Sequence, residues 1–292
     1  MTGVVAKGMV SLEGGTFQMG SGQFYPEERP VRRASVEAFA IDAHPVTNEQ
    51  FAQFVAATGY VTLAEQPGAA ADYPDADPAL LVPGSAVFTP PPGPVPVRDP
   101  RLWWRYVPFA SWHAPEGPGS DLRGRERHPV VHVAFEDAEA YASWAGKALP
   151  AESEWEYAAR GGLECAAYAW GEDPSPGGRV MANTWTGQFP WQNLRGGGFE
   201  RTSPVECFPA NGYGLYDMTG NVWEWTTDIY DPSGGGGDCC GVVGAGPRRL
   251  VVKGGSHLCA PNYCLRYRPA ARQGQTPDTS TSHIGIRCVV RR

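Results

Sequence analysis

The hydrophobic and polar positions of the chain recur at helical spacing in three short stretches. The first begins with a capping-box pattern, Thr47 followed by Gln50, and stops at Gly59. The second covers residues 136–145 and the third covers residues 152–160, and each is again followed by glycine. Because glycine readily takes the left-handed conformation that closes a helix, the pattern predicts three short helices.

Other stretches predict strands or irregular structure. Residues 130–134 and 249–253 alternate between apolar and polar positions and predict β-strands. Residues 65–127 are rich in proline, alanine and aspartate. We interpret this part as a long surface excursion and as a candidate wall of a substrate groove.

Composition agrees with a chain of short elements. Glycine (37 residues) and proline (28 residues) are spread through the 292 residues, which predicts many turns. Ten tryptophans and twelve tyrosines must then supply much of the packing that long helices would otherwise supply. No repeat and no break in composition divides the sequence, so we expect a single α+β domain over residues 1–292.

Charge and apolar runs limit the partners of the protein. The formal charge of −7 comes from interspersed acidic and basic residues without a basic stripe, which argues against nucleic acid as a partner. No apolar run approaches the roughly 20 residues of a membrane helix, and no apolar signal segment follows Met1. We therefore expect a soluble protein, cytoplasmic if bacterial, that is monomeric and has no membrane partner.

The sharpest chemical pattern is a pair of cysteines. The chain has seven cysteines, too few for a secreted disulfide scaffold, and Cys259 and Cys264 stand five apart after two glycines. Zinc is disfavoured because a structural site takes four ligands, and a disulfide is disfavoured in a reducing cytosol. Two thiolates suit Cu(I), a soft ion. The spacing by itself leaves copper, a disulfide and unrelated core residues open, and it assigns no role to Cys207, Cys239 or Cys240.

A second pattern is typical of hard cations. Within residues 214–225, the carboxylates of Asp217 and Glu224 stand seven apart around turn glycines, and such oxygens can surround Ca²⁺. A capped turn with solvated acids explains the pattern equally well. A third and weaker cation case comprises Asn183, Thr184 and Phe199.

Familiar catalytic motifs are missing from the sequence. It contains no Gly-x-Ser-x-Gly elbow, no phosphate-binding P-loop and no His-Glu-x-x-His helix. The acidic residues Glu152, Glu154 and Glu156 stand two apart, so neighbours in this run do not share one helix face. We interpret the run as a helix-start charge pattern with a solvated face.

Longer motifs add what spacing cannot. They include Gly14-Gly-Thr-Phe-Gln-Met-Gly20, His44-Pro-Val-Thr-Asn-Glu-Gln-Phe51, Glu154-Trp-Glu-Tyr-Ala-Ala-Arg-Gly-Gly162, Gly220-Asn-Val-Trp-Glu-Trp225 and Gly285-Ile-Arg-Cys288. The chain also carries the cysteine pair, Arg-Tyr-Arg at 266–268 and Thr-Pro-Asp-Thr-Ser at 276–280. With these motifs, the chain resembles the formylglycine-generating enzyme (sulfatase-modifying factor) family, bacterial type, along nearly its whole length. The first set is shared with the wider family, and the second set distinguishes its catalytic branch.

The resemblance implies a fold, an activity and roles. The fold is the loop-rich formylglycine-generating-enzyme fold, related to C-type lectins. The activity is oxidation by O2 of a cysteine in a Cys-x-Pro-x-Arg-type motif of an unfolded or nascent sulfatase to formylglycine. Cys259 and Cys264 would bind Cu(I) as thiolates, the substrate cysteine would add a third sulfur, and dioxygen would bind near Ser256. The other residues implied for the oxygen pocket or substrate groove are Trp112, Trp223, Tyr263, Arg266, Ser280 and His283.

The resemblance also implies structural calcium. One site is matched, although the family commonly has Asn at the position of Asp217. A second site is doubtful, because Gly197 aligns with its usual aspartate and a hard cation loses affinity with each lost carboxylate. The residues matched to the first site are Asp217, Gly220, Val222 and Glu224. The residues matched to the second site are Asn183, Thr184 and Phe199.

Several positions depart from the family pattern. Ala151 replaces a threonine N-cap worth about 1 kcal/mol, and Ile286 replaces phenylalanine. His283 replaces an asparagine near the oxygen pocket. Ala159 aligns with the usual disulfide partner of Cys288.

Two other hypotheses share the same fold. An iron-dependent sulfoxide synthase generally carries an additional helical domain, for which we expect no room before Met9. A non-catalytic binding module would need neither Cys259 nor Cys264.

Overall fold

The computed structural model describes residues 8–71, 73–75, 77–232 and 247–292. Its α-helices are short: α1 spans Asn48–Thr58, α2 spans Phe135–Trp144 and α3 spans Glu152–Arg160. All three predicted helices are therefore confirmed. No helix within the described ranges is both long enough and apolar enough to cross a membrane. The 3₁₀ helices are Pro26–Glu28, Leu63–Glu65, Pro78–Leu80, Pro100–Leu102 and Pro176–Gly178.

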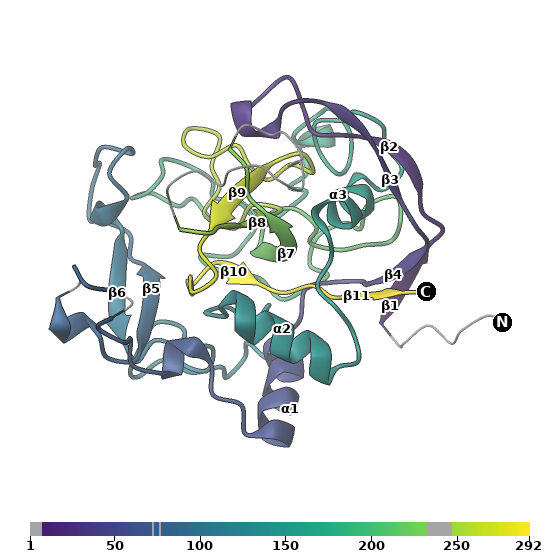
Figure 1. Ribbon diagram of the computed structural model, residues 1–292. Helices are drawn as coiled ribbons and strands as arrows, with labels where there is room; N and C mark the ends of the chain where they lie inside the picture. The colour runs from purple at the N-terminus through teal and green to yellow at the C-terminus, as the bar shows by residue number, and fades with distance from the viewer. Residues whose placement is uncertain (1–7, 72, 76, 233–246) are drawn as a thin grey trace.

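The strands form small separate sheets in the mixed, loop-rich architecture that was expected (Figure 1). The central four-stranded sheet has the order β10-β7-β8-β9 and consists of β10 Ile284–Gly285, β7 Trp223–Ile229, β8 Leu250–Lys253 and β9 Arg272–Gln275. A three-stranded sheet joins both ends of the chain and consists of β1 Met9–Leu12, β4 Phe39–Asp42 and β11 Val289–Arg291. The remaining pairs are β2 Gly15–Met19 with β3 Arg32–Val36, and β5 Gly84–Phe88 with β6 Trp104–Pro108.

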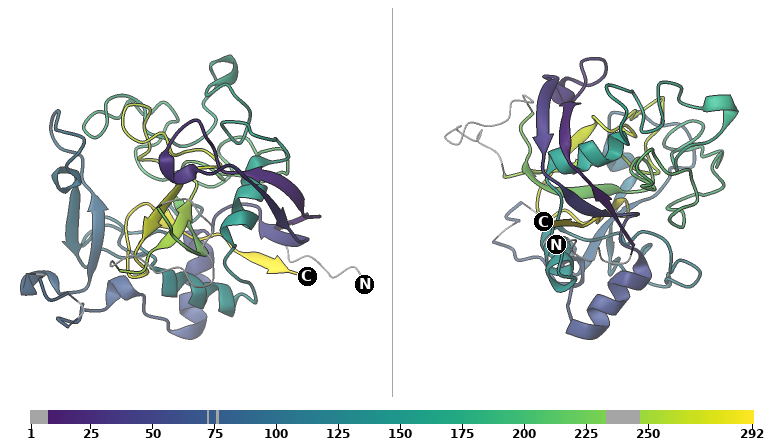
Figure 2. Two further views of the ribbon diagram at one scale, coloured as in Figure 1. Left: turned by 45° about the horizontal axis from the view of Figure 1, so that its top comes forward. Right: turned by 90° about the vertical axis from the view of Figure 1, so that its right-hand side faces the viewer.

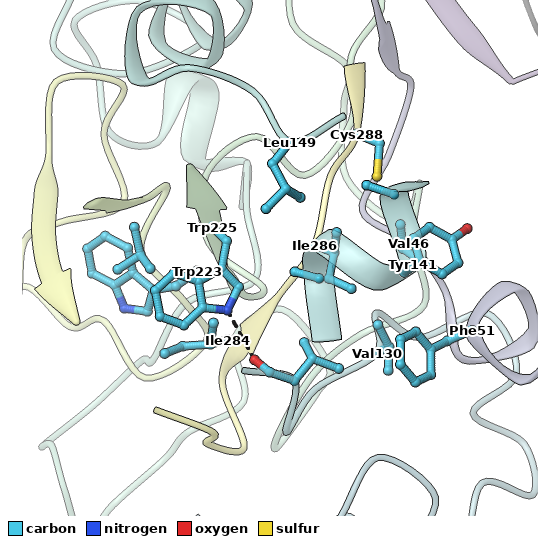
Figure 3. Close-up of a cluster of buried hydrophobic side chains, with 14 of the residues drawn as sticks. Val46, Phe51, Val130, Tyr141, Leu149, Trp223, Trp225, Ile284, Ile286 and Cys288 are labelled. Atoms are coloured by element: carbon cyan, nitrogen blue, oxygen red, sulfur yellow. Dashed lines mark hydrogen bonds between the residues drawn. The ribbon is translucent and has the colours of Figure 1, made fainter. Parts of the chain in front are cut away.

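The largest core cluster lies between the central sheet and helices α1 and α2. Figure 3 shows Ile286 between the tryptophans of β7 and the aromatic rings of Phe51 and Tyr141. The indole of Trp225 donates to the carbonyl oxygen of Val133 at 3.0 Å, so its polar nitrogen is satisfied inside the cluster. Cys259 and Cys264 belong to the same cluster, which places both sulfurs at the edge of a rigid core.

One of the two predicted strands is absent and the other is present. Residues 130–134 do not form a strand, because His132 has a left-handed backbone (φ 62°) that interrupts extended structure. The backbone amides of this stretch donate instead to separate loops, Val130 N to Val46 O and His132 N to Thr281 O. The strand predicted at 249–253 is confirmed as β8.

The region 65–127 is more than a surface excursion. It contains the hairpin β5–β6, which lies on one side of the molecule (Figures 1 and 2). The side chains of Val87, Phe88 and Trp103 are at most 3% exposed. Phe88 and Trp103 pack into a second aromatic cluster, so this region provides both core and pocket wall.

The acidic run at the start of α3 is not a solvated face. Glu152 and Glu156 stand four apart, so they share one face of the helix, and both are at most 3% exposed. Glu156 pairs with Arg160 at 2.7 Å, and Arg272 pairs with Glu152 at 2.8 Å. Ala151 has no side-chain oxygen to cap the helix. The carboxylate of Asp228 in strand β7 takes this role, because it accepts from Glu152 N at 2.6 Å.

Candidate active site

The two cysteines lie in the loop that follows β8. Gly254 and Gly255 have left-handed backbones (φ 96° and 71°), and a Cβ atom at Gly255 would lie 2.7 Å from the carbonyl oxygen of Arg266. Only glycine permits this close turn, which returns the loop toward the sheet. Cys264 N donates to Ala260 O at 2.8 Å in a helix-like turn, and the two Sγ atoms lie 3.3 Å apart.

Burial and hydrogen bonding distinguish the two thiols. The pKa of Cys264 is lowered to about 7, first by a hydrogen bond from Cys259 and then by the nearby guanidinium of Arg266. Burial raises the pKa of Cys259. The pair therefore favours a thiolate on Cys264 that accepts from the thiol of Cys259. Two adjacent soft sulfurs, one already inclined to ionise, fit Cu(I) as a donor set.

A pocket of about 300 Å³ opens beside the sulfurs. On one wall, the ring of Tyr263 stacks on Phe189 with centroids 4.3 Å apart, and Trp103 meets both rings edge-on. The lining also has polar members, including Arg249 and Gln273. The pocket beside the sulfurs therefore combines aromatic rings with hydrogen-bonding groups.

The imidazole of His283 also lines the pocket. Its Nδ1 lies 2.6 Å from the hydroxyl of Thr281, and its ring packs against Trp104 with centroids 4.8 Å apart. Burial, followed by the charges of His257 and His132, lowers the pKa of His283 to about 3. His283 therefore presents a neutral ring to the pocket at physiological pH.

The structure brings together most, but not all, of the residues implied for the pocket. Trp112 lies instead in the core cluster, edge-on to Phe51 with ring centroids 5.3 Å apart. The Ser280 hydroxyl faces the hairpin and lies 3.0 Å from the hydroxyl of Ser85. Neither lines the pocket. The implied residues that do line it are Ser256, Trp223, Cys259, Tyr263, Cys264, Arg266 and His283.

Sequence reasoning missed other lining residues because they come from distant parts of the chain. They include Glu27 near the N-terminus, Trp103 and Trp104 at the start of β6, and Phe189 from an irregular loop. The adjacent tryptophans inside a polar, proline-rich stretch were the one available signal. Cys207 is exposed, whereas Cys239 and Cys240 lie outside the described residues.

The turn matched to the first calcium site has a different carboxylate arrangement from the expected one. Asp217 has a left-handed backbone, Oδ2 accepts from Glu206 N at 2.9 Å, and burial raises the pKa of its carboxyl to about 6. Both oxygens of Glu224 bind Arg287, at 2.9 and 3.0 Å, and Oε2 also accepts from the indole of Trp155 at 2.6 Å. A buried carboxylate needs a cationic partner, and the partner of Glu224 is the guanidinium of Arg287.

The other two residues matched to this calcium site, Gly220 and Val222, have no side-chain oxygen and could offer an ion only backbone groups. Gly220 has a left-handed backbone, and its N–H donates to Gly254 O at 2.9 Å. Val222 is wholly apolar and buried. Within the described ranges, no three histidine, cysteine or acidic side chains converge to hold a metal ion.

The second, weaker calcium case has no carboxylate. Asn183 donates through its side-chain Nδ2 to Arg201 O at 2.9 Å, and its backbone carbonyl accepts from Asn221 N at 2.8 Å. A Cβ atom at Gly197 would lie 3.1 Å from the ring of Phe208, which also meets Phe199 edge-on. Thr184 lines a separate, open surface pocket.

The fold is similar to that of solved structures. The structure of PvdO from Pseudomonas aeruginosa matches with a TM-score of 0.67 and 24% identity, covering 97% of this chain and 94% of that chain. This likeness defines the class of fold, a loop-rich mixed domain with little regular secondary structure.

Sequence comparison then gives the family. The model of the sulfatase-modifying factor enzyme 1-like domain matches residues 3–292. The chain belongs to this family. It is 57% identical to the formylglycine-generating enzyme of Mycobacterium tuberculosis, over 96% of the chain and 97% of that relative. It is also 40% identical to the inactive C-alpha-formylglycine-generating enzyme 2 of Mus musculus, over 96% of the chain and 84% of that relative. Membership of the family alone therefore does not distinguish a catalytic member from an inactive one.

Proposed function

We propose that the protein is a formylglycine-generating oxidase that uses Cu(I) and O2 to convert a cysteine in a Cys-x-Pro-x-Arg-type motif of a sulfatase polypeptide to formylglycine. The observation that carries the proposal is the Sγ–Sγ separation of 3.3 Å between Cys259 and Cys264, at the wall of a pocket. Neither a binding module nor a scaffold needs two converging thiols there. The high identity to a relative with this name supports the same substrate class.

The overall chemistry is a two-electron oxidation followed by hydrolysis. One hydrogen leaves the substrate Cβ and one leaves its sulfur, and both are formally taken up by O2 as hydrogen peroxide. The resulting thioaldehyde adds water and releases hydrogen sulfide, which leaves the aldehyde. Cu(I), when held by Cys259 and Cys264, would supply the oxygen chemistry.

The residues of the chain perform the binding and orienting parts of this reaction. The aromatic wall of Trp103, Phe189 and Tyr263 confines the substrate backbone beside the sulfurs and excludes water from that side. The neutral ring of His283 adds no charge that would compete with the thiolates. Cys264 carries the more acidic thiol, so it gives up its proton first when a soft cation binds.

Mass spectrometry of a short peptide tests the proposal. A peptide with the Cys-x-Pro-x-Arg motif is incubated with metal-free protein, O2 and stoichiometric Cu(I). Conversion exchanges the cysteine sulfur for oxygen and also removes two hydrogens, so the product differs in mass from both the cysteine and the serine peptide. Conversion that requires Cu(I) is the expected result. Conversion restored by Fe(II) alone would favour an iron-dependent sulfoxide-synthase-like chemistry, and no conversion with either ion would favour a non-catalytic member.

Calcium is proposed as a structural ion at the Asp217 turn only. The carboxylate of Asp217 is buried there among backbone groups, and a hard cation would offset the cost of that burial. Glu224 is committed to Arg287, so we do not assign its side chain to the ion. The Asn183 site lacks a carboxylate, and we propose no calcium there.

A further inference from the structure

A short N-terminal segment holds the chain that follows Cys264. We call residues 24–28 the clamp segment. The hydroxyl of Tyr25 accepts from Leu265 N at 2.9 Å, across 240 positions of sequence. Glu28 binds Arg268 in a pair whose side chains are both wholly buried. The clamp segment therefore fixes the backbone on the C-terminal side of the cysteine pair.

Between these two anchors, the clamp segment also fixes the direction of one guanidinium. Oε1 of Glu27 accepts from Arg266 Nη2 at 2.6 Å and from Nε at 3.2 Å. The ring of Tyr25 lies 3.9 Å from the guanidinium carbon and covers its face. The remaining nitrogen, Nη1, donates to Cys264 Sγ at 3.8 Å. Because a guanidinium is planar, holding one edge determines where the other edge points.

We propose that Glu27 is a positioning residue of the two-cysteine site: it orients Arg266 so that the guanidinium donates to the Cys264 sulfur and holds that sulfur ready to bind Cu(I). This inference rests on the proposed copper function. Partners that hold a metal ligand from the second layer typically change metal affinity by 10–100-fold when they are removed.

The pair of Arg266 and Glu27 is partly shielded from water. The side chains of Arg266 and Glu27 are 24% and 15% exposed. Glu27 is the member of the clamp segment that lines the pocket, whereas Tyr25 and Glu28 already anchor the loop without contacting the sulfur. The contact of the Glu27 carboxylate with Arg266 can thus be removed while Tyr25 and Glu28 still anchor the loop.

The test measures Cu(I) affinity by competition with a chromophoric chelator in the absence of O2, with thermal unfolding recorded in parallel. Glu27→Gln keeps the shape and an acceptor oxygen but removes the negative charge. Arg266→Lys keeps the positive charge but removes the planar guanidinium that donates from both edges. We expect each to weaken Cu(I) binding about 10-fold or more, and the double variant to bind about as weakly as either single variant. Glu206→Gln removes an exposed carboxylate paired with Arg127 and should bind like the unchanged protein.

Different outcomes separate this inference from the proposed function. Unchanged protein that binds no Cu(I) would refute the copper function itself. Tight binding by Glu27→Gln, or fully additive losses in the double variant, would overturn the positioning role alone. Loss of the folding transition in Glu27→Gln would likewise overturn it, because Glu27 would then be an anchor of the fold.

Discussion

Lys253 is wholly buried, and its Nζ donates to the Glu156 carboxylate at 2.9 Å. This pair joins the last residue of β8 to helix α3 immediately before the glycine turn that leads to the cysteines. Glu152 lies 3.6 Å from the same nitrogen. The direction of the cysteine loop therefore depends on a buried charge cluster that lies outside the pocket.

Replacing Lys253 by methionine should destabilise the fold. Glu156 would keep Arg160 as a partner, but it would lose a buried cation that no solvent can replace. Breaking a buried pair costs 3–5 kcal/mol, and we expect about 3 kcal/mol because one partner remains. Urea unfolding measures the change. The exposed-pair variant Glu206→Gln should change the free energy of unfolding by at most about 1 kcal/mol, and equal effects in the two variants would contradict the prediction.

The buried cluster also shows where the sequence stops being informative. The three helices were predictable because their caps and glycine stops are local, as with Thr47 and Gly59. The burial of Glu156 was not predictable from the sequence, because its partner Lys253 is 97 positions away and no local pattern links the two residues. The wrong strand at 130–134 has a similar origin, since tertiary bonds to other loops fix the backbone at His132.

The candidate site divides in the same way. Cys259 and Cys264 lie close together because one short loop carries both, and the two glycines before this loop indicate the turn in the sequence. The Glu27 side and the Phe189 side of the pocket come from loops that meet only in the folded chain. Arg266, which the family motif named, lines the pocket, but the motif did not reveal the carboxylate that binds its guanidinium.

Cys264→Ser should abolish aldehyde formation on the motif peptide. Oxygen is a poor ligand for Cu(I), so the soft donor pair is broken while the side chain stays nearly the same size. Turnover should fall by at least about 100-fold, the upper end of the loss expected when a metal's surroundings are disturbed. Circular dichroism and thermal unfolding should show an intact fold, with Cys259→Ser behaving alike. An active double serine variant would refute the copper assignment.

Calcium should raise the thermal stability of the metal-free protein. An ion that binds the folded state stabilises it by about 2.7 kcal/mol at 100 times its dissociation constant. The increase should disappear in Asp217→Ala, which removes the buried carboxylate, and should persist in Asn183→Ala. Differential scanning calorimetry with and without a chelator measures it. An equal increase in all three proteins would mean that calcium binds elsewhere.

Stability at acidic pH should depend on His283. Its pKa is about 3 in the folded protein and about 6.5 in an unfolded chain, so between these values only the unfolded state takes up the proton. The free energy of unfolding therefore decreases as the pH falls below about 6.5. His257 and His132, each with a pKa lowered to about 4, act in the same direction. Asp137, with a pKa raised to about 6, acts in the opposite direction.

The variant His283→Asn removes the contribution of His283 together with its coupling to His257 and His132. Asparagine cannot take up a proton, so the variant should lose stability less steeply between pH 6 and pH 4.5, by at most about 1.4 kcal/mol per pH unit. Urea unfolding across this range gives the two curves, and the curve of the unchanged protein should be the steeper one. Parallel curves would mean that the imidazole is protonated as easily in the pocket as in water, which the burial of its ring against Trp104 and its bond to Thr281 argue against.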